Sequence, residues 1–391
     1  MQRRRPGQVR DAIVRSLSER PAGASVAEIE RDVERDLGAV ATSSIRSYLR
    51  LNTPELFVRM DRGQYTLQGF ADVPTGREEA AAIASPTGRT YRLGRALLVH
   101  DDCLRWLGQQ PCNSIHAVVT DPPYGLVEYS DKEQEKLRRG KGGVWRIPPS
   151  FDGSVRSPLP RFTTLTPAEL DALDRFFVEW GRQLLRVVVP GANVVVASNP
   201  LLSHRIASAL ARAGLERRGE LVRLVMTMRG GDRPKAAHLE FSGVSVMPRS
   251  MWEPWLLFRK PLEGRVQDNL RRWGTGGFRR ISDQRPFGDV IASSPTRPAE
   301  RRLANHPSLK PQAFLRQVVR GVLPLGDGVV LDPFAGSGST LAAAEAVGYL
   351  SIGVERDSAY FDLAREAIPR LRSMTVADHE GGAASCDQAS L

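Results

Sequence analysis

The chain lacks the features that mark secreted, membrane-spanning and zinc-binding proteins. Its three cysteines, Cys103, Cys112 and Cys386, show no paired spacing, which argues against a disulfide framework and a zinc site. Its apolar runs are short, such as residues 193–197, whereas a membrane helix needs roughly 20 apolar residues. No apolar core follows the basic residues 1–7, so no secretory signal is visible. We therefore expect a reduced, soluble protein inside the cell, with no bound metal.

What is present is an ordinary globular composition. Of the 391 residues, 41% are hydrophobic and 25% are charged, which excludes a wholly disordered or fibrous protein. At about 150 residues per domain, this length predicts two to three domains.

The net charge of +11 is concentrated in one segment. Residues 259–320 contain fourteen Lys and Arg residues against five Asp and Glu residues, a local excess of nine positive charges. A solvated basic surface is one interpretation. A polyanionic partner is the other, because each phosphate that a basic side chain neutralises releases condensed counterions.

The N-terminal part has the pattern of three helices followed by a β-hairpin. Apolar residues recur at helical spacing over residues 8–19, and Ser25 with Glu28 forms a capping box before a second helix. A third helix is expected over residues 42–50 and two short strands within residues 56–67. This is the winged-helix pattern, in which the third helix can enter a major groove. A protein–protein adaptor is the alternative use.

The following part alternates short β-branched strands with helices, which predicts a Rossmann-like α/β fold with a doubly wound parallel sheet. Strands are expected at residues 96–99, 115–120, 192–197, 220–226, 255–258, 328–331 and 350–354, and helices at 167–185, 203–213 and 339–347.

These patterns divide the chain into four parts. They are a winged-helix domain at residues 1–69, a linker at 70–90, an α/β domain at 91–372 and a disordered tail at 373–391. Two long, weakly periodic segments inside the α/β domain, residues 125–166 and 261–307, are expected to be functional loops.

A glycine-rich turn follows the strand at residues 328–331. Gly336 and Gly338 let the backbone approach a ligand closely because they carry no Cβ. Glu355 ends the next strand, where an acidic side chain can bind ribose hydroxyls. The glycine spacing is not that of a dinucleotide fingerprint, and no Lys follows to bind phosphates. A nucleoside without phosphates, such as S-adenosylmethionine, fits better, and a purely structural turn is the alternative.

A second motif, Asp121-Pro122-Pro123-Tyr124, stands at the end of the strand at residues 115–120. Ligands of open α/β sheets bind beyond such strand ends. The two prolines fix the backbone and remove two N–H groups, which leaves carbonyls free to accept hydrogen bonds. A carboxylate beside such a carbonyl can accept both hydrogens of a planar amino group, and Tyr124 can stack on the attached ring.

Together these motifs resemble those of the beta-class DNA amino-methyltransferases, which act on adenine N6 or cytosine N4 with S-adenosylmethionine. In the permuted order of this class the catalytic motif precedes the cofactor loop, as it does here. The resemblance covers roughly residues 91–372, and it also includes the segments 102–104, 252–261, 306–311 and 354–357.

The resemblance implies a role for each matching residue. Asp121, Pro122, Pro123 and Tyr124 would be catalytic. The cofactor would be bound by Asp102, Cys103, His306, Ser308, Lys310, Asp332, Pro333, Phe334, Ala335, Gly336, Ser337, Gly338, Ser339, Thr340, Glu355 and Arg356.

The resemblance also places the target-recognition region at residues 262–305, within the segment of highest positive charge. Arginines there could contact phosphates and base edges, and residues 128–145 could form a clamp or a solvated loop. The candidate DNA-binding residues are Arg271, Arg272, Arg279, Arg280, Arg285, Arg301 and Arg302.

The aspartate in the catalytic motif favours adenine, because in the family aspartate accompanies mostly adenine and serine mostly cytosine. The cysteines are not expected to attack a cytosine ring, and small buried thiols are the preferred interpretation for Cys103 and Cys112. Cytosine N4 is the first alternative. An RNA methyltransferase and a catalytically inactive DNA-binding regulator are the others.

The expected partner is double-stranded DNA, with no membrane, in a cytoplasmic, nucleoid-associated protein. No nuclease motif accompanies the α/β domain, so a restriction or defence partner would be a separate chain. A homodimer is left open.

Overall fold

The computed structural model describes residues 8–18, 20, 23–53, 56–61, 63–67, 83–84, 88–123, 165–225, 237, 239–245, 251–304, 306 and 309–376. The chain forms two compact units, and each is described by itself. The smaller comprises Met1–Thr75 with Gly264–Gly274, and the larger comprises Gly76–Glu263 with Thr275–Leu391. Within these described ranges, no helix is long and apolar enough to cross a lipid bilayer.

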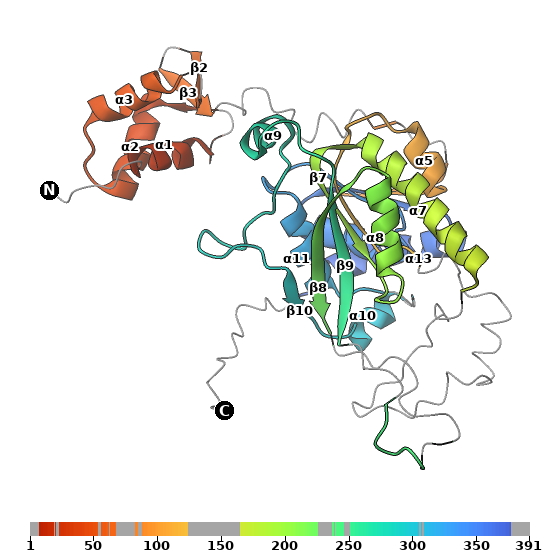
Figure 1. Cartoon of the computed structure of the whole chain (residues 1–391). Coiled ribbons are helices and arrows are strands. Elements are labelled where there is room, and N and C mark those ends of the chain that lie inside the picture. Colours follow the sequence, from red (N-terminus) through yellow and green to blue (C-terminus); the bar gives the residue numbers. More distant parts are fainter. Residues whose placement is uncertain are drawn as a thin grey trace. The chain divides into compact units, whose positions relative to one another are not determined.

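The N-terminal residues of the smaller unit form three helices and a small antiparallel sheet of order β1-β3-β2. Ser25 caps the second helix in a capping box with Glu28, as predicted. The elements of the predicted winged helix are therefore present, while its assignment to that class and its role on DNA stay predictions. The elements are α1 (Gln8–Ser18), β1 (Ala24–Ser25), α2 (Val26–Leu37), α3 (Thr42–Leu51), β2 (Phe57–Asp61) and β3 (Gln64–Leu67) (Figure 1).

The larger unit is built on a nine-stranded sheet of order β10-β8-β9-β7-β6-β11-β12-β5-β4. All neighbouring pairs are parallel except those that β9 and β4 form. The strands are β4 (Thr90–Leu93), β5 (Ala96–His100), β6 (Ile115–Thr120), β7 (Val188–Ala197), β8 (Glu216–Leu224), β9 (Trp252–Arg259), β10 (Val290–Ala292), β11 (Val329–Asp332) and β12 (Leu350–Glu355).

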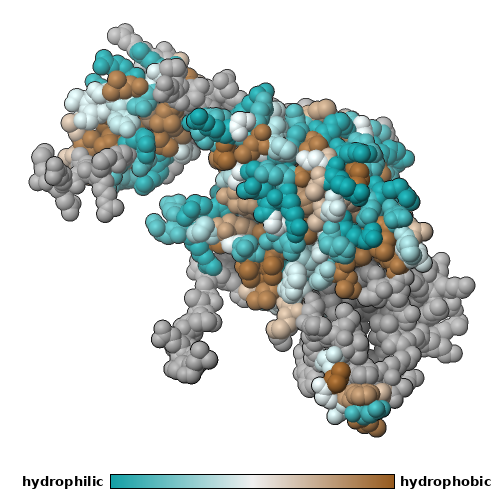
Figure 2. Space-filling view, viewed as in Figure 1, coloured by the Kyte–Doolittle hydropathy of each residue, from teal (hydrophilic) through white to brown (hydrophobic). Residues whose placement is uncertain are grey.

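Helices cover both faces of this sheet, so the predicted doubly wound α/β fold is confirmed (Figure 1). One face carries α5 (Cys103–Gln109), α7 (Pro167–Val187) and α8 (Ser203–Arg212), and the other carries α11 (Gln312–Val322), α12 (Ser339–Ala346) and α13 (Ser358–Arg372). Hydrophilic side chains cover much of the outer surface around α7 and α8 (Figure 2). The opposite stripe of α7, which includes Phe177 and Trp180, is buried.

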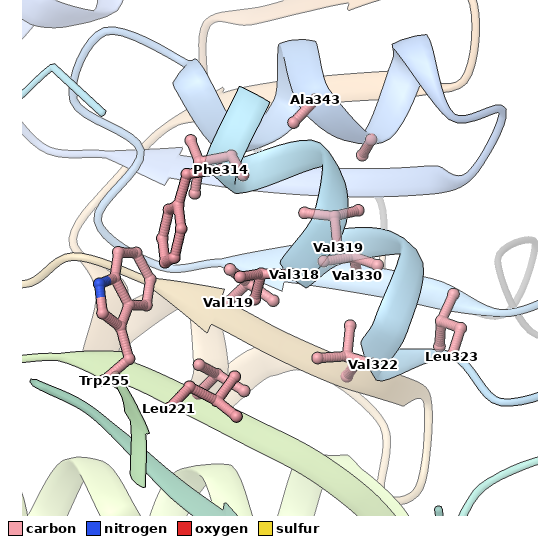
Figure 3. Close-up of a cluster of buried hydrophobic side chains, with 14 of the residues drawn as sticks. Val119, Leu221, Trp255, Phe314, Val318, Val319, Val322, Leu323, Val330 and Ala343 are labelled. Carbon is pink, nitrogen blue, oxygen red and sulfur yellow. The ribbon is translucent and has the colours of Figure 1, made fainter. Parts of the chain in front are cut away.

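The main core lies between the sheet and α11. Val119 and Val330 come from the two central strands, and Trp255 of β9 meets Phe314 of α11 with ring centroids 5.1 Å apart (Figure 3). These side chains are at most 1% exposed. Burying an apolar side chain of this size contributes about 2–3 kcal/mol, so this cluster fixes α11 and the residues before it against the sheet.

All seven strands and all three helices that the sequence predicts for this unit are present. Among these elements the largest errors in bounds are the starts of β7 and β8, which each begin four residues early. The strand β4 and the helices α5, α11 and α13 were not predicted. Gly191 in β7 and Gly219 in β8 have positive φ angles and stand beside register shifts. Such bulges continue a strand through residues that a sequence rule treats as breaks.

The description of residues 261–307 as loop is wrong in part. The segment contains α9 (Val266–Trp273), the edge strand β10 and α10 (Pro298–Leu303). A three-residue strand is too short to show alternation, so its position depends on pairing with β8. Nearly all of the other predicted loop at 125–166, including the predicted clamp at 128–145, lies outside the described residues, as do most of the linker and the tail.

Candidate active site

The carboxyl ends of five parallel strands meet at one edge of the sheet. β5, β12, β11, β6 and β7 all run in the same direction. The chain leaves β6 toward β7 on one side, whereas it leaves β11 toward β12 on the other. Doubly wound sheets bind their ligands at such a switch point. Here it lies between Asp121, directly after β6, and Asp332, the last residue of β11.

A buried hydrogen bond joins the two strand ends at this switch point. The hydroxyl of Thr120 donates to Oδ1 of Asp332 over 2.6 Å. The same oxygen accepts the N–H of Phe334 over 3.2 Å. Thr120 is fully buried and Asp332 is 3% exposed, so these bonds form away from water. They hold the Asp121-Pro122-Pro123 motif and the glycine-rich turn, far apart in sequence, side by side.

The carboxylate of Asp121 is paired with an ammonium group. Nζ of Lys310 donates to Oδ2 of Asp121 over 2.5 Å and lies 3.2 Å from Oε1 of Glu253. The resemblance assigned Lys310 to the cofactor. The structure brings its charged end to Asp121, while its contact with the cofactor stays a prediction, and sequence reasoning missed Glu253. The only signal for Glu253 was its place in the segment 252–261.

The glycine-rich turn has the backbone that its sequence predicts. Gly336 and Gly338 adopt φ angles of +51° and +75°, and Gly338 is the N-cap of α12. A Cβ on Gly338 would lie 2.4 Å from Ile368, and a Cβ on Gly336 would lie 3.1 Å from the ring of His306. Neither position has room for a side chain, so the packing of the turn against Ile368 and His306 requires glycine at both.

Acidic side chains stand at the ends of the two strands beyond β11. The Glu355 carboxylate accepts the N–H of Gly336 and that of Asp357, both over 2.7 Å. Asp102 follows β5 and caps α5, with its Oδ1 accepting the N–H groups of Leu104 and Arg105. A carboxylate oxygen has two lone pairs, so Glu355 can hold the turn and still accept a ribose hydroxyl. The residues present therefore fit a nucleoside cofactor.

An aromatic group borders the turn. Phe334 is partly buried, and its ring lies 5.6 Å from Trp180 and 6.2 Å from Phe176, both on α7. On the other side, His306 packs edge-on against Tyr360. The predicted residues Tyr124 and Ser308 lie outside the described residues.

Burial changes the titration of two groups here. Burial of Asp332 raises the pKa of its carboxyl to about 6, against the opposing hydrogen bond from Thr120. Burial, with the nearby charge of Lys310, lowers the pKa of His306 to about 4. Near neutral pH the imidazole is therefore uncharged, and Asp332 is largely ionised.

The cysteine prediction is half right. Cys103 is buried, and this burial raises the pKa of its thiol to about 12, so it is not a nucleophile near neutral pH. Cys112, in contrast, is exposed, because it lies in the turn before β6. Across the described part of the chain, no group of three His, Cys, Asp or Glu side chains could hold a metal ion.

The seven candidate DNA-binding arginines do not share one place. Arg271 and Arg272 belong to the smaller unit, where Arg271 pairs with Asp268 of the same helix over 3.0 Å. In the larger unit, Nη1 of Arg279 donates to the hydroxyl of Tyr349 over 2.7 Å. Tyr349 directly precedes β12, so this contact lies at the amino edge of the sheet, away from Asp121.

Arg280 and Arg285 lie at this same amino edge. The Arg280 carbonyl accepts from Arg320 near the end of α11, and Arg285 belongs to the adjoining turn.

The last two arginines lie at the carboxyl edge. Arg301 and Arg302 are exposed in the last turn of α10. The Glu300 carboxylate accepts the N–H of Gln312, whose side-chain amide donates to the Ser339 carbonyl at the start of α12. These bonds place α10 beside the glycine-rich turn.

The sequence profile of the DNA methylase family matches residues 115–366, which is well over half of the chain. This range contains Asp121, the glycine-rich turn and Glu355. The chain belongs to the N6/N4 DNA methylase family. It is similar to the type II methyltransferase M2.DpnII of Streptococcus pneumoniae, with 21% identity over 71% of this chain and 91% of that protein. It is also similar to M.HindIII of Haemophilus influenzae, with 23% identity over 64% and 88% of the two chains.

Solved structures with a related arrangement include two methyltransferases. The cytosine-N4-specific PvuII DNA methyltransferase has 13% identity and a TM-score of 0.48, covering 74% of this chain and 95% of its own. The M1.HpyAVI–SAM complex has 17% identity and a TM-score of 0.43, covering 69% and 98%.

The titration of Asp332 predicts a pH dependence of the methylase's stability. Its pKa is higher in the folded than in the unfolded chain, so between about pH 4 and 6 only the folded chain holds this proton. The free energy of unfolding should therefore fall as pH rises through this range, by an amount on the order of 2–3 kcal/mol. His306 acts in the opposite direction over a similar range, because its pKa is lowered.

An Asp332→Asn variant isolates the contribution of Asp332, since the contribution of His306 cancels in the comparison with the unaltered chain. Chemical denaturation at about pH 4.5, 5.5, 6.5 and 7.5 covers the range between the unfolded and folded pKa values of Asp332 and extends beyond it. The free energy of unfolding of the variant should increase relative to that of the unaltered methylase as pH rises. Parallel pH curves for the two proteins would contradict the prediction.

Proposed function

We propose that this methylase transfers a methyl group from S-adenosylmethionine to the exocyclic amine of a base in double-stranded DNA, with adenine N6 as the target. One observation carries the proposal. The hydrogen bond from Thr120 to Asp332 holds an Asp-Pro-Pro motif and a glycine-rich turn side by side at the switch point of a doubly wound sheet. Methyl transfer needs an amine-binding group next to a nucleoside-binding group.

The glycine-rich turn supports S-adenosylmethionine as the donor. Gly336 and Gly338 give the turn its left-handed backbone, Glu355 can accept ribose hydroxyls, and Phe334 offers an aromatic face for a base. Asp102 and Cys103 stay proposed at the far end of the cofactor, and Arg356 stays proposed beside Glu355 in the ribose-binding segment. When bound, S-adenosylmethionine supplies an electrophilic methyl group.

The chain's own residues make the target amine reactive. The lone pair of an exocyclic amine is delocalised into the ring, so the amine is a poor nucleophile. Hydrogen bonds to the Asp121 carboxylate and the Pro122 carbonyl favour a pyramidal nitrogen with a localised lone pair. The carboxylate also stabilises the positive charge that develops on nitrogen. A duplex base must leave the stack to reach this site, and we assign Tyr124 the role of stacking on it.

Adenine rather than cytosine is supported by the aspartate at position 121, the form that accompanies mostly adenine in the family. Both amines present the same two hydrogens to Asp121 and Pro122, so this geometry alone suits either base.

The target base can be identified from the reaction product. Incubation with plasmid DNA and labelled S-adenosylmethionine, followed by mass spectrometry of the nucleosides, should yield labelled N6-methyladenine. Labelled N4-methylcytosine instead would overturn adenine and leave the amine mechanism in place. Label in RNA but in no DNA nucleoside would overturn the DNA substrate.

The role of Asp121 predicts a selective loss of catalysis. Asp121→Ala removes the group that receives the amine, so methyl transfer should fall by roughly 100- to 1,000-fold or more. Binding of S-adenosylmethionine, measured by calorimetry, should survive. Asp283→Ala is the matched control, because Asp283 is an exposed carboxylate near the opposite edge of the sheet. Comparable turnover of the two variants would contradict the assignment.

The two edges of the sheet predict which arginines bind DNA. Arg301→Ala with Arg302→Ala removes two charges beside the site. We expect DNA affinity to fall roughly tenfold, and the slope of log Kd against log salt concentration to decrease by about two. Arg280→Ala with Arg285→Ala removes the same charge at the amino edge and should leave both nearly unchanged. Fluorescence anisotropy over a salt series measures both quantities. Equal losses in the two double variants would indicate a diffuse basic surface instead.

A further inference from the structure

A row of alternating charges runs inward from the catalytic carboxylate. Asp121 pairs with Lys310 over 2.5 Å, and Lys310 lies 3.2 Å from Glu253. The other oxygen of Glu253 accepts from Nη1 of Arg223 over 2.8 Å. The four groups come from the end of β6, the segment before α11, and the paired positions of β9 and β8. We call this row the charge ladder.

The charge ladder is buried and electrically neutral. The side chains of Asp121, Lys310, Glu253 and Arg223 are 16%, 10%, 4% and 6% exposed. Removing such ions from water costs several kcal/mol each unless every charge is paired. Lys310 alone would neutralise Asp121. The additional Glu253–Arg223 pair is therefore not needed for charge balance at Asp121, and it costs free energy to bury.

We propose that Glu253 and Arg223 are positioning residues that align Asp121 through Lys310. This inference rests on the proposed function of Asp121. A lysine ammonium is a point charge on a flexible four-carbon stem, so one partner does not fix its position. Glu253 supplies the second partner, and Arg223 in turn holds Glu253. An ammonium fixed in this way holds Oδ2 of Asp121 and sets the plane of the carboxylate.

The aromatic core supports this positioning role. Nζ of Lys310 lies 5.9 Å from the ring centre of Trp255, and the guanidinium of Arg223 lies 5.4 Å from that of Phe314. The two rings pack against each other in the main core (Figure 3). The two cations of the charge ladder thus lie against a buried aromatic pair of the main core.

The charge ladder ends in the basic segment 262–305. Nε of Arg223 donates to the Ser293 hydroxyl over 3.1 Å, and Nη2 donates to the Ser294 carbonyl over 3.0 Å. These serines directly follow β10. Through Arg223, the position of Asp121 therefore depends on residues of the segment proposed to recognise the target.

The same two strands provide a matched control. Glu216 of β8 and Arg259 of β9 are also cross-strand partners, and their side chains pair over 2.7 Å. This pair stands at the opposite edge of the sheet and contacts no member of the charge ladder in any described bond. Glu216→Gln thus removes a comparable interaction, although Glu216 is more exposed than Glu253.

The test compares Glu253→Gln with Glu216→Gln in single-turnover methyl transfer with the full chain in excess over DNA. For Glu253→Gln we expect the rate constant at saturation to fall roughly 10- to 100-fold, because misalignment of a reacting group by about 1 Å has that effect. The Kd values for S-adenosylmethionine and DNA should stay within about twofold. Glu216→Gln should match the unaltered chain in all three quantities.

Removing one charge can also impair folding, since it leaves a buried cation unpaired. The double variant Arg223→Gln with Glu253→Gln keeps the site neutral and should show the same loss of rate with full reaction amplitude. A partly folded protein would raise the total protein concentration needed for saturation, because less of it is active, but would leave the rate constant at saturation unchanged.

Three outcomes would overturn the inference. Unaltered rate constants in both Glu253 variants would show that Lys310 needs no second partner. Equal losses of rate and of ligand binding would indicate a merely structural role. Absence of methyl transfer by the unaltered chain would overturn the proposed function and this inference together, whereas the first two outcomes leave the proposed function standing.

Discussion

The parallel alignment of β6 and β11 is the constraint on which the rest of the site depends. Because the two strands run side by side, their carboxyl ends deliver Asp121 and the glycine-rich turn to the same place. The buried bond from Thr120 to Asp332 locks that placement in a region without competing water. A shift of either strand would separate the proposed amine-binding group from the proposed nucleoside-binding turn, and methyl transfer requires both to act on reactants in contact.

The site collects charged groups that are expensive to bury. Asp332 is kept at a raised pKa, and Asp121, Lys310, Glu253 and Arg223 form one neutral row. Such groups weaken a core unless each is paired. Burying these charges at one edge of the sheet costs folding free energy at the proposed site. Burial of the apolar cluster around Trp255 and Phe314 offsets this cost.

The sequence predicts most of the fold because the central strands of this sheet, such as β6, β7 and β11, are buried on both sides. Such strands appear as short apolar runs that contain β-branched residues, for example Val329–Asp332. It fails at β10, whose three residues form a strand only because β8 pairs with them. It also fails at β7 and β8, where bulges carry the strand past residues that normally end one.

Within the site, the sequence by itself determined the residues whose chemistry depends on local order. Asp121 beside two prolines and Gly338 at a helix start are features of consecutive residues, and a local pattern fixes them. Only the tertiary structure decided which side chains contact one another and at which edge of the sheet they lie. Lys310 meets Asp121 and Glu253 across long separations in the chain, and Arg301 and Arg279 fall at opposite edges of one sheet. Contacts of this kind arise from strand order and packing, which no short run of residues encodes.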